Sequence, residues 1–167
     1  MRSTMEYEIM YEDEALMLVY KPAGIAVETS RLGQQDMVSL LRNYRALQKQ
    51  DTYIGLVHRL DQPVEGLMVF GKTKEATANL SAQVANRSFG KHYLAIGKKP
   101  KTDSAQSVLQ KKGTLEGWIF FDRQKNVSRL VKKGTPQAKA ACLDYEVMGE
   151  TKDYVCFAIT LHTATHH

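Results

Sequence analysis

The sequence predicts an α+β fold: a mainly antiparallel mixed sheet with a few flanking helices. Short segments rich in β-branched and aromatic residues recur along the 167 residues, and only two segments place apolar residues at helical spacing. The strands follow one another in runs and do not alternate with helices as they do in βαβ units. The chain length is typical of one domain, so we expect a single domain over residues 1–167.

The N-terminal part predicts a hairpin followed by a helix. Residues 7–11 and 15–20 are expected to be strands, joined by a turn at the acidic cluster 12–14. Asp36 is a suitable N-cap for a helix whose apolar side chains recur at helical spacing: Met37, Leu40, Leu41, Tyr44 and Leu47. The same spacing places the basic residues largely on the outer faces of this helix: Arg42, Arg45 and Lys49.

A polar corner, residues 58–63, is expected between two short strands at 53–57 and 66–71. Thr73 then predicts the N-cap of a second helix, which runs to about Asn86. The other predicted strands are 93–96, 118–121, 138–148 and 154–161.

Charge is segregated along the chain. Residues 41–140 hold 19 basic and 7 acidic side chains, a net charge of +12, whereas residues 1–40 hold 3 and 7, and residues 141–167 hold 1 and 4. A basic block of this kind attracts a phosphate backbone and releases its counterions, so a nucleic-acid partner is one interpretation. A solvated lysine-rich surface would have the same composition. Charge alone does not identify the partner.

Composition argues against several classes of function. The longest apolar run, residues 15–20, is far short of the roughly 18 residues that a membrane span requires. The acidic N-terminus is unlike a secretory signal, so we expect a cytoplasmic protein without a membrane partner. No glycine-rich phosphate loop occurs, which argues against ATP and dinucleotide chemistry. The cysteines and histidines lack metal-site spacing, so no metal is expected.

The polar corner contains the residues best suited to chemistry, His58-Arg59-Leu60-Asp61-Gln62-Pro63. A loop held by two strands is a rigid place for a catalytic carboxylate. An aspartate before a proline also stabilises many turns, with Arg59 as a local charge partner here. From these residues alone, both interpretations of Asp61 remain open.

The corner is also part of a longer motif. His58-Arg59-Leu60-Asp61, followed by Gly66-Leu67 and Phe70-Gly71-Lys72-Thr73, closely resembles the signature of the RluA-type pseudouridine synthases. Further matches occur in the family order: Tyr11-Glu12-Asp13, Tyr20-Lys21-Pro22-Ala23-Gly24, Lys91-His92-Tyr93-Leu94-Ala95, Ala138-Lys139-Ala140 and Leu143-Asp144-Tyr145-Glu146-Val147. The resemblance extends from about residue 7 to residue 163. It implies the pseudouridine synthase fold and the isomerisation of uridine to pseudouridine in structured RNA, either tRNA or rRNA.

The resemblance implies roles for the matching residues. Asp61 falls at the family's essential aspartate, which attacks the ribose or assists removal of its 2′ proton, so that uracil detaches and rejoins through C5. Tyr93 matches the tyrosine that packs against the target base and assists proton removal from C5. Arg59 matches an arginine that in some members fills the stack left by the flipped nucleotide, and His58 beside it is grouped with these substrate-binding residues. The reaction requires no cofactor or metal, and no obligatory protein partner is expected.

The match stops before the last motif of the family. After Leu161-His162-Thr163, family members continue with Gly-Arg, whose arginine pairs with the catalytic aspartate, but Ala164-Thr165 follows here. We therefore expect a catalytic domain that is truncated at its C-terminus and is slow or inactive in this form. Two alternatives remain open. One is an RNA-binding relic without catalysis, and the other is a carboxylate-dependent hydrolase with Glu65 as its second acid.

Overall fold

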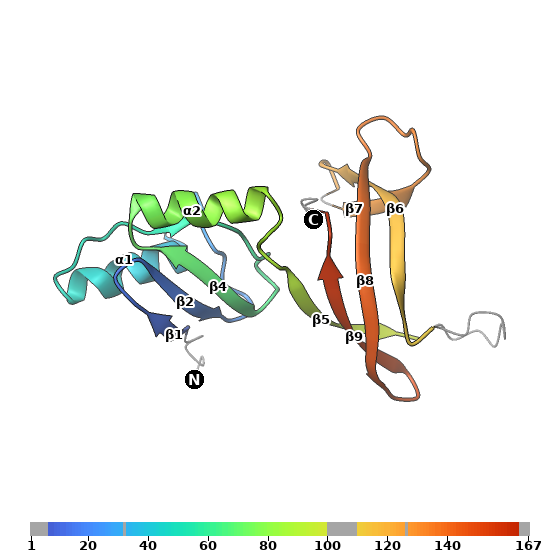
Figure 1. The fold of residues 1–167 in the computed structure, drawn as a ribbon, viewed down its shortest axis with the longest axis horizontal. Helices are drawn as coiled ribbons and strands as arrows, with labels where there is room; N and C mark the ends of the chain where they lie inside the picture. Colours follow the sequence, from blue (N-terminus) through green and yellow to red (C-terminus); the bar gives the residue numbers. More distant parts are fainter. Residues whose placement is uncertain (1–6, 32, 100–109, 126, 164–167) are drawn as a thin grey trace. The chain divides into compact units, whose positions relative to one another are not determined.

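The computed structural model describes residues 7–31, 33–99, 110–125 and 127–163. The chain divides into two compact units, Met1–Phe89 and Gly90–His167 (Figure 1). The strand ladders in both units are antiparallel, and both helices of the described ranges belong to the first unit. That the two units make a single domain over residues 1–167 stays a prediction.

The first unit contains a four-stranded antiparallel sheet in the order β1-β2-β4-β3. Its strands are β1 (Glu8–Glu12), β2 (Leu16–Lys21), β3 (Gly55–Leu56) and β4 (Gly66–Gly71). β1 and β2 form the predicted hairpin, in whose turn Asp13 Oδ1 accepts the N–H groups of Ala15 and Leu16, both at 2.8 Å. The strand predicted at 53–57 is shorter than expected, because only the two residues of β3 pair with β4.

The two helices begin at the caps that the sequence predicts. α1 (Met37–Leu47) follows Asp36, whose Oδ1 accepts the Ser39 N–H at 2.7 Å. α2 (Lys74–Ala85) follows Thr73, whose hydroxyl accepts a main-chain N–H three residues further on at 3.1 Å. Each cap supplies an acceptor to an N–H group that the helix itself leaves without one. Both helix predictions are confirmed, and neither of these helices has the length and apolar composition to cross a membrane.

The core of the first unit lies between its sheet and α1. Alternate side chains of β2 point into this core, beginning with Met17 and Val19, and α1 contributes Met37 and Leu41. The rest of the buried cluster consists of Ile25, Val27, Val38, Ile54, Met68 and Phe70. Burying a large apolar side chain contributes about 1.5–3 kcal/mol, so this cluster is the main source of stability in the unit.

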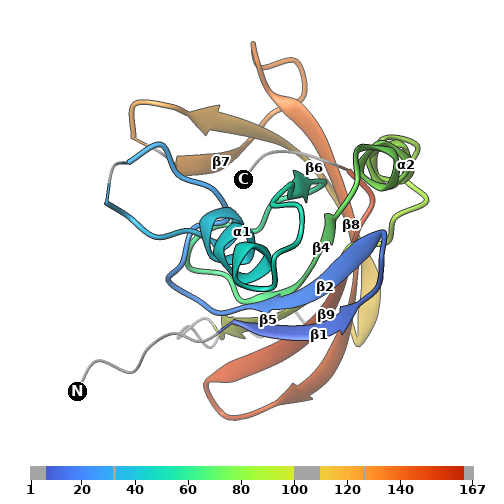
Figure 2. The ribbon, with the colours of Figure 1, turned by 90° about the vertical axis from the view of Figure 1, so that its left-hand side faces the viewer.

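α2 covers the face of the sheet opposite to α1 (Figure 2). Gly55 on β3 and Gly71 on β4 are register partners, and Thr77 of α2 packs over both. A Cβ atom at either glycine would overlap Thr77, so the close approach of α2 depends on both glycines. The Tyr53 hydroxyl donates to Thr77 Oγ1 at 3.2 Å and adds a polar contact.

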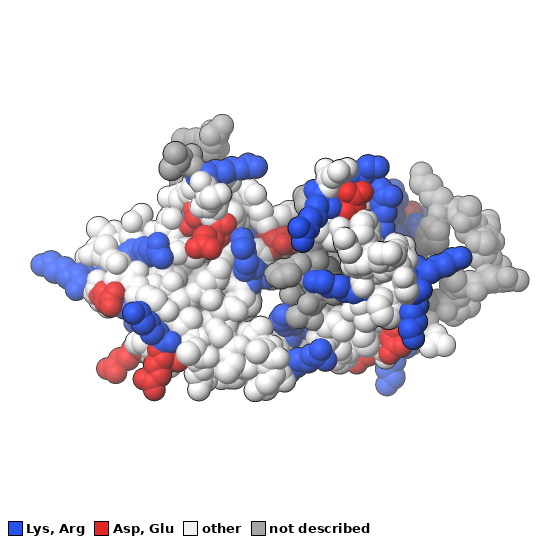
Figure 3. Space-filling view, turned by 90° about the horizontal axis from the view of Figure 1, so that it is seen from above, with Lys and Arg blue, Asp and Glu red and all other residues white. Residues whose placement is uncertain are grey.

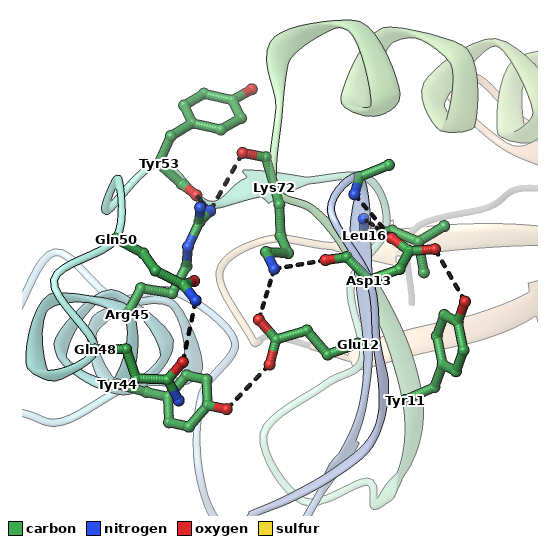
Figure 4. A network of polar contacts seen from close by, with 11 residues as sticks. Tyr11, Glu12, Asp13, Leu16, Tyr44, Arg45, Gln48, Gln50, Tyr53 and Lys72 are labelled. Carbon is green, nitrogen blue, oxygen red and sulfur yellow. Dashed lines mark hydrogen bonds and ion pairs between the residues drawn. The ribbon is translucent and has the colours of Figure 1, made fainter.

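A polar network joins α1 to the hairpin and to the end of β4 (Figure 4). The prediction that Arg45 lies on an outer face is wrong, because its side chain is buried. Its Nη1 donates to the carbonyl oxygens of Tyr53 at 2.6 Å and Lys72 at 3.2 Å. The Lys72 ammonium in turn contacts the Glu12 carboxylate, with 2.6 Å between Nζ and Oε1. The other residues of that prediction are exposed, namely Arg42 and Lys49.

The second unit is a five-stranded antiparallel sheet in the order β5-β9-β8-β6-β7. Its strands are β5 (His92–Lys98), β6 (Lys112–Asp122), β7 (Val127–Val131), β8 (Lys139–Glu150) and β9 (Tyr154–Leu161). The four strands predicted in this region are confirmed, although β6 is much longer than expected. β7 is an edge strand that the sequence analysis does not predict.

One face of the second sheet is apolar but only half buried. Tyr93 on β5 and Tyr145 on β8 both pair in register with Ile159, so the three side chains share this face. Phe157 packs edge-on against Tyr145, with 6.0 Å between ring centroids and 81° between planes. Within the described ranges, Val155 is the only buried hydrophobic residue of this unit. The second sheet is therefore much less enclosed than the core of the first unit.

Candidate active site

Asp61 lies on an exposed turn between β3 and β4. The main chain closes this turn, because the Val64 N–H donates to the Asp61 carbonyl oxygen at 3.0 Å. The Asp61 carboxylate itself accepts no hydrogen bond from the described residues and forms no ion pair with them. An aspartate that stabilises a turn does so through its side-chain oxygens. Asp61 does not use its carboxylate in this way.

The buried ammonium group of Lys21 anchors the main chain beside Asp61. Lys21 ends β2, and its side chain has 0% exposure. Its Nζ donates to the carbonyl oxygens of Val64 at 2.6 Å, Pro22 at 3.0 Å and Gln62 at 3.4 Å. A lysine has three N–H donors, and each of them has an acceptor here. Two of these acceptors belong to the turn that bears Asp61.

Lys21 also places a positive charge beneath this turn. Burial lowers the pKa of the Lys21 ammonium from its ordinary value, while the negative charges of Asp61 and Glu65 act in the opposite direction. Lys21 forms no direct ion pair within the described ranges. Its charge therefore lies near the Asp61 turn without occupying the carboxylate oxygens.

A second pair of contacts joins the turn to the loop after β2. The Gly24 N–H donates to the Gln62 carbonyl oxygen at 2.7 Å, and Gln62 Nε2 donates to the Gly24 carbonyl oxygen at 2.9 Å. Gly24 has a φ of 91°, in the region that favours glycine. The reciprocal contact holds Gln62, the residue after Asp61, through both its main chain and its side chain.

His58 contacts β4 and the segment that follows α2. Its Nε2 accepts the Val69 N–H at 3.1 Å, and its ring centroid lies 5.2 Å from that of Phe89. An Nε2 acceptor assigns the proton of the neutral ring to Nδ1. These contacts give His58 a supporting role in the corner. The contact with substrate that the resemblance implies stays a prediction.

Arg59 has an exposed side chain on the same corner. Its Nη2 makes one long hydrogen bond, at 3.5 Å, to the Glu28 carbonyl oxygen. It forms no ion pair with Asp61 in the described part of the chain, so it is not the charge partner of that turn. The guanidinium group is thus held weakly and is accessible to a ligand.

Tyr93 belongs to the second unit, on β5. The apolar face that it shares with Ile159 has a hollow of about 210 Å³, lined by Leu115, Leu143, Tyr145, Phe157 and Ile159. The structure therefore brings His58, Arg59 and Asp61 together in one corner of the first unit. Tyr93 lies on β5 of the second unit.

A larger hollow, of about 540 Å³, includes a polar hydrogen-bonded group of the second sheet. The Thr114 hydroxyl donates to Asp144 Oδ1 at 2.6 Å, and His162 Nε2 lies 2.7 Å from Asp144 Oδ2. These two hydrogen bonds hold the pKa of Asp144 below its ordinary value. Asp144 and Thr114 are register partners and lie on the face opposite to Tyr145. This polar group therefore lies on the face of the sheet away from the ring of Tyr145.

Neither Lys21 nor Gln62 is predicted from the sequence to support the Asp61 carboxylate. The sequence does indicate that Lys21 is buried. It follows Met17 and Val19 at two-residue spacing and so occupies an inward position of β2. A lysine at such a position requires buried hydrogen-bond partners. No local signal exists for Gln62, whose partner Gly24 is 38 residues away in the chain.

Metal binding has no visible basis in the described part of the chain. No group of three or more His, Cys, Asp or Glu side chains gathers there as a metal site would require. The expectation of a reaction without metal or cofactor stays a prediction.

Comparison with known families identifies the class of protein. The model of the RNA pseudouridylate synthase family matches residues 15–167 of this chain. The chain therefore belongs to the RNA pseudouridylate synthase family. The recognition based on the RluA-type motifs is confirmed.

Curated relatives include enzymes named for two kinds of RNA. Ribosomal large subunit pseudouridine synthase D of Pseudomonas aeruginosa is 31% identical over 165 residues, which cover 98% of this chain and 48% of the relative. The tRNA pseudouridine synthase C of Pasteurella multocida is 36% identical over 92 residues, which cover 55% of this chain and 37% of the relative. The chain thus spans about half the length, or less, of these relatives.

A solved structure supports the fold. Human RNA Pseudouridylate Synthase Domain Containing 4 matches with a TM-score of 0.74 at 20% sequence identity, over 95% of this chain and 60% of that chain. The predicted α+β fold is confirmed by this likeness.

Proposed function

We propose that this protein isomerises uridine to pseudouridine in structured RNA, with Asp61 as the catalytic carboxylate. The observation that carries the proposal is the condition of Asp61: an exposed carboxylate, unused by its own turn, on main chain that Lys21 anchors. Relatives named for rRNA and for tRNA support an RNA substrate without choosing between the two. Action in the cytoplasm, without cofactor or obligatory protein partner, is part of the same proposal.

A carboxylate suits this reaction because the ribose carbon becomes electron-poor as uracil leaves. Asp61 either forms a bond to C1′ of the ribose, which breaks again when C5 bonds to C1′, or removes the 2′ proton and returns it to C2′ afterwards. In both cases the bond from C1′ to N1 breaks, the uracil turns, and a bond from C1′ to C5 forms. C5 then loses its proton and N1 gains one, so the product is an isomer of the substrate. No oxidant, reductant or leaving group enters the balance.

The substrate-binding residues of the proposal match the physical demands of base flipping. Extrusion of a stacked uridine costs a few kcal/mol, which new contacts must offset. The accessible guanidinium of Arg59 suits the vacated place in the stack, because a planar cation stacks well on bases. Tyr93 is proposed to pack against the uracil and to assist proton removal from C5. His58, beside Arg59, is retained as a substrate-binding residue.

The test is tritium release from RNA that contains C5-labelled uridine, measured for the parent protein and for Asp61→Asn. We expect the variant to lose release completely while its circular dichroism and its RNA affinity persist. Glu65→Gln is the matched control, because it removes a neighbouring carboxylate that the proposal does not use. Release by Asp61→Asn at the parent rate would contradict the proposal. Free uracil as the product would favour the hydrolase instead.

The comparison should also be made in a Thr165→Arg background. Position 165 departs from the arginine of the family motif, so the parent rate is expected to be low. The added arginine gives the Asp61→Asn comparison a measurable reference rate.

A further inference from the structure

The β7 edge of the second sheet carries a strongly basic segment. We define the basic arm as residues 118–125 and 127–139, from the end of β6 through β7 to the first residue of β8. The arm contains six Lys or Arg residues and a single acidic residue, Asp122, so its net charge is +5. None of its cations forms an ion pair with a described residue. The six exposed cations are Arg123, Lys125, Arg129, Lys132, Lys133 and Lys139.

The two turns of the basic arm are held in shape by their own hydrogen bonds. Asp122 Oδ1 accepts the N–H groups of Gln124 and Lys125, both at 3.1 Å. In the other turn, the Thr135 N–H and hydroxyl donate to the Lys132 carbonyl oxygen at 3.2 and 2.8 Å. The one carboxylate of the arm therefore serves the main chain and neutralises none of the cations by direct contact. Four of the six cations lie beside these hydrogen bonds, namely Arg123, Lys125, Lys132 and Lys133.

The spacing of these charges suits an extended polyanion. β7 has five residues and separates the two turns by about 14 Å, the axial length of roughly four stacked nucleotides. Arg129 lies midway along it and pairs in register with Phe120 of β6. Register partners share a face, and Trp118 lies on the same face two residues before Phe120. Cations interleaved with aromatic rings are typical of surfaces that bind both the phosphates and the bases of RNA.

We propose that the basic arm binds the RNA backbone at nucleotides other than the target uridine. Lys and Arg side chains outnumber Asp and Glu over the second unit in Figure 3. This inference rests on the proposed function, which identifies the polyanion as RNA. The inference adds the surface of the protein that binds this RNA. A membrane surface would also attract the cations, but the ring-and-guanidinium pair on the arm favours RNA.

The test measures affinity for a hairpin RNA made of guanosine and cytidine only, across a salt series. Such a probe contains no uridine, so it reports backbone binding separately from isomerisation. The arm variants are Lys132→Gln/Lys133→Gln and Arg123→Gln/Lys125→Gln. The control is Lys98→Gln/Lys152→Gln, which removes the same charge from two exposed positions of the second unit outside the arm, at the end of β5 and between β8 and β9.

We expect each arm variant to lower the log–log salt slope by about 1.4 to 1.8, since each released contact contributes about 0.7 to 0.9. The affinity at 0.1 M salt should fall by roughly tenfold or more. The control should change the slope by much less. Circular dichroism should be unchanged in all variants, because the substituted side chains are exposed.

Each contrary outcome has a distinct meaning. If RNA binding by the parent depends on salt but the arm and control variants have equal slopes, the inference about the arm is refuted and the proposed function remains intact. A parent without salt-dependent affinity for RNA would overturn both. Loss of binding to phosphatidylserine vesicles, with an unchanged RNA slope, would make the arm a membrane contact and refute the inference. Failure of tritium release alone would refute the proposed function while the arm's RNA binding stood.

Discussion

The ammonium nitrogen of Lys21 lies 2.6 Å from the carbonyl oxygen of Val64, although 43 residues separate the two in the chain. The contact ties the end of β2 to the turn that bears Asp61. A buried carbonyl that loses its donor costs about 1–3 kcal/mol, so Lys21→Met should lower the free energy of unfolding by at least that order. The turn itself should loosen. Amide hydrogen exchange at Val64 and Gly24, followed by NMR, should become faster.

Lys72→Met is the matched control for this prediction. Lys72 is a second buried lysine of the first unit, but its Nζ contacts Glu12 and the Asp13 carbonyl oxygen. Its loss should also reduce stability, with faster exchange near the hairpin turn and little change at Val64. If both variants accelerated exchange at Val64 equally, Lys21 would have no specific role at the Asp61 turn.

Asp36 and Asp61 should differ in their response to replacement by Asn. The Asp36 carboxylate accepts the N–H groups of Ser39 and Thr29, at 2.7 and 2.9 Å, whereas the Asp61 carboxylate supports no part of its turn. Urea denaturation should therefore show a loss of about 0.5–2 kcal/mol for Asp36→Asn. The loss for Asp61→Asn should be under about 0.5 kcal/mol, as for an ordinary surface change. Similar losses would mean that Asp61 is structural after all.

The Asp36 cap should also shape the stability of the protein in acid. Burial acts to raise the pKa of Asp36, but hydrogen bonds from Ser39 and Thr29 outweigh it and hold the pKa below the ordinary 3.8. The unfolded chain thus takes up this proton at a higher pH than the folded chain does. The contribution is complete above the ordinary pKa and is lost as pH falls through the lower folded value. The stability gap between parent and Asp36→Asn should shrink below about pH 4, and a constant gap down to pH 2 would contradict this.

Arg59→Ala should reduce modification of a stacked or base-paired uridine more than that of the same uridine in an unstructured oligonucleotide. A side chain that fills a vacated stack matters only where a stack exists. Tritium release from the two substrates gives the ratio directly. Arg42→Ala removes an exposed arginine of α1 and should leave the ratio unchanged. Equal losses on both substrates would assign Arg59 a structural role beside Asp61.

Thr165→Arg should raise the rate of tritium release above that of the parent. Residue 165 lies outside the described ranges, and the prediction rests on the family motif, in which an arginine pairs with the catalytic aspartate. Thr165→Gln is the control, because it adds length without charge. Equal rates for the Arg and Gln variants would show that no cation is missing at this position.

The elements that were predicted well depend on local interactions. Asp36 and Thr73 cap their helices through hydrogen bonds to residues three positions away, and the β1–β2 hairpin turns on contacts within Asp13–Leu16. Interactions over so few residues leave a pattern that a single sequence displays. The same is true of the Asp61 corner, whose motif is continuous.

The elements that were missed depend on distant partners or on weak patterning. β7 is exposed along nearly its whole length, with Leu130 at 79%, so neither face imposes an apolar alternation. Arg45 seemed an outward residue because its acceptors, the carbonyl oxygens of Tyr53 and Lys72, lie outside its helix. Lys21 reaches carbonyl oxygens as far as 43 residues away. Spacing within one element contains no information about such partners.

Because main-chain atoms anchor the turn, the position of Asp61 does not depend on which side chains its neighbours carry. Among the described residues, the Lys21 ammonium donates hydrogen bonds only to the carbonyl oxygens of Pro22, Gln62 and Val64, and every amino acid supplies the same oxygen. A side-chain change at Val64 leaves the anchoring atom in place, whereas a change at Lys21 releases three contacts at once. The turn can therefore acquire new side chains while the Asp61 carboxylate keeps its place. In the proposed function, the residues of this turn can change while a residue on another strand keeps the proposed catalytic carboxylate in place.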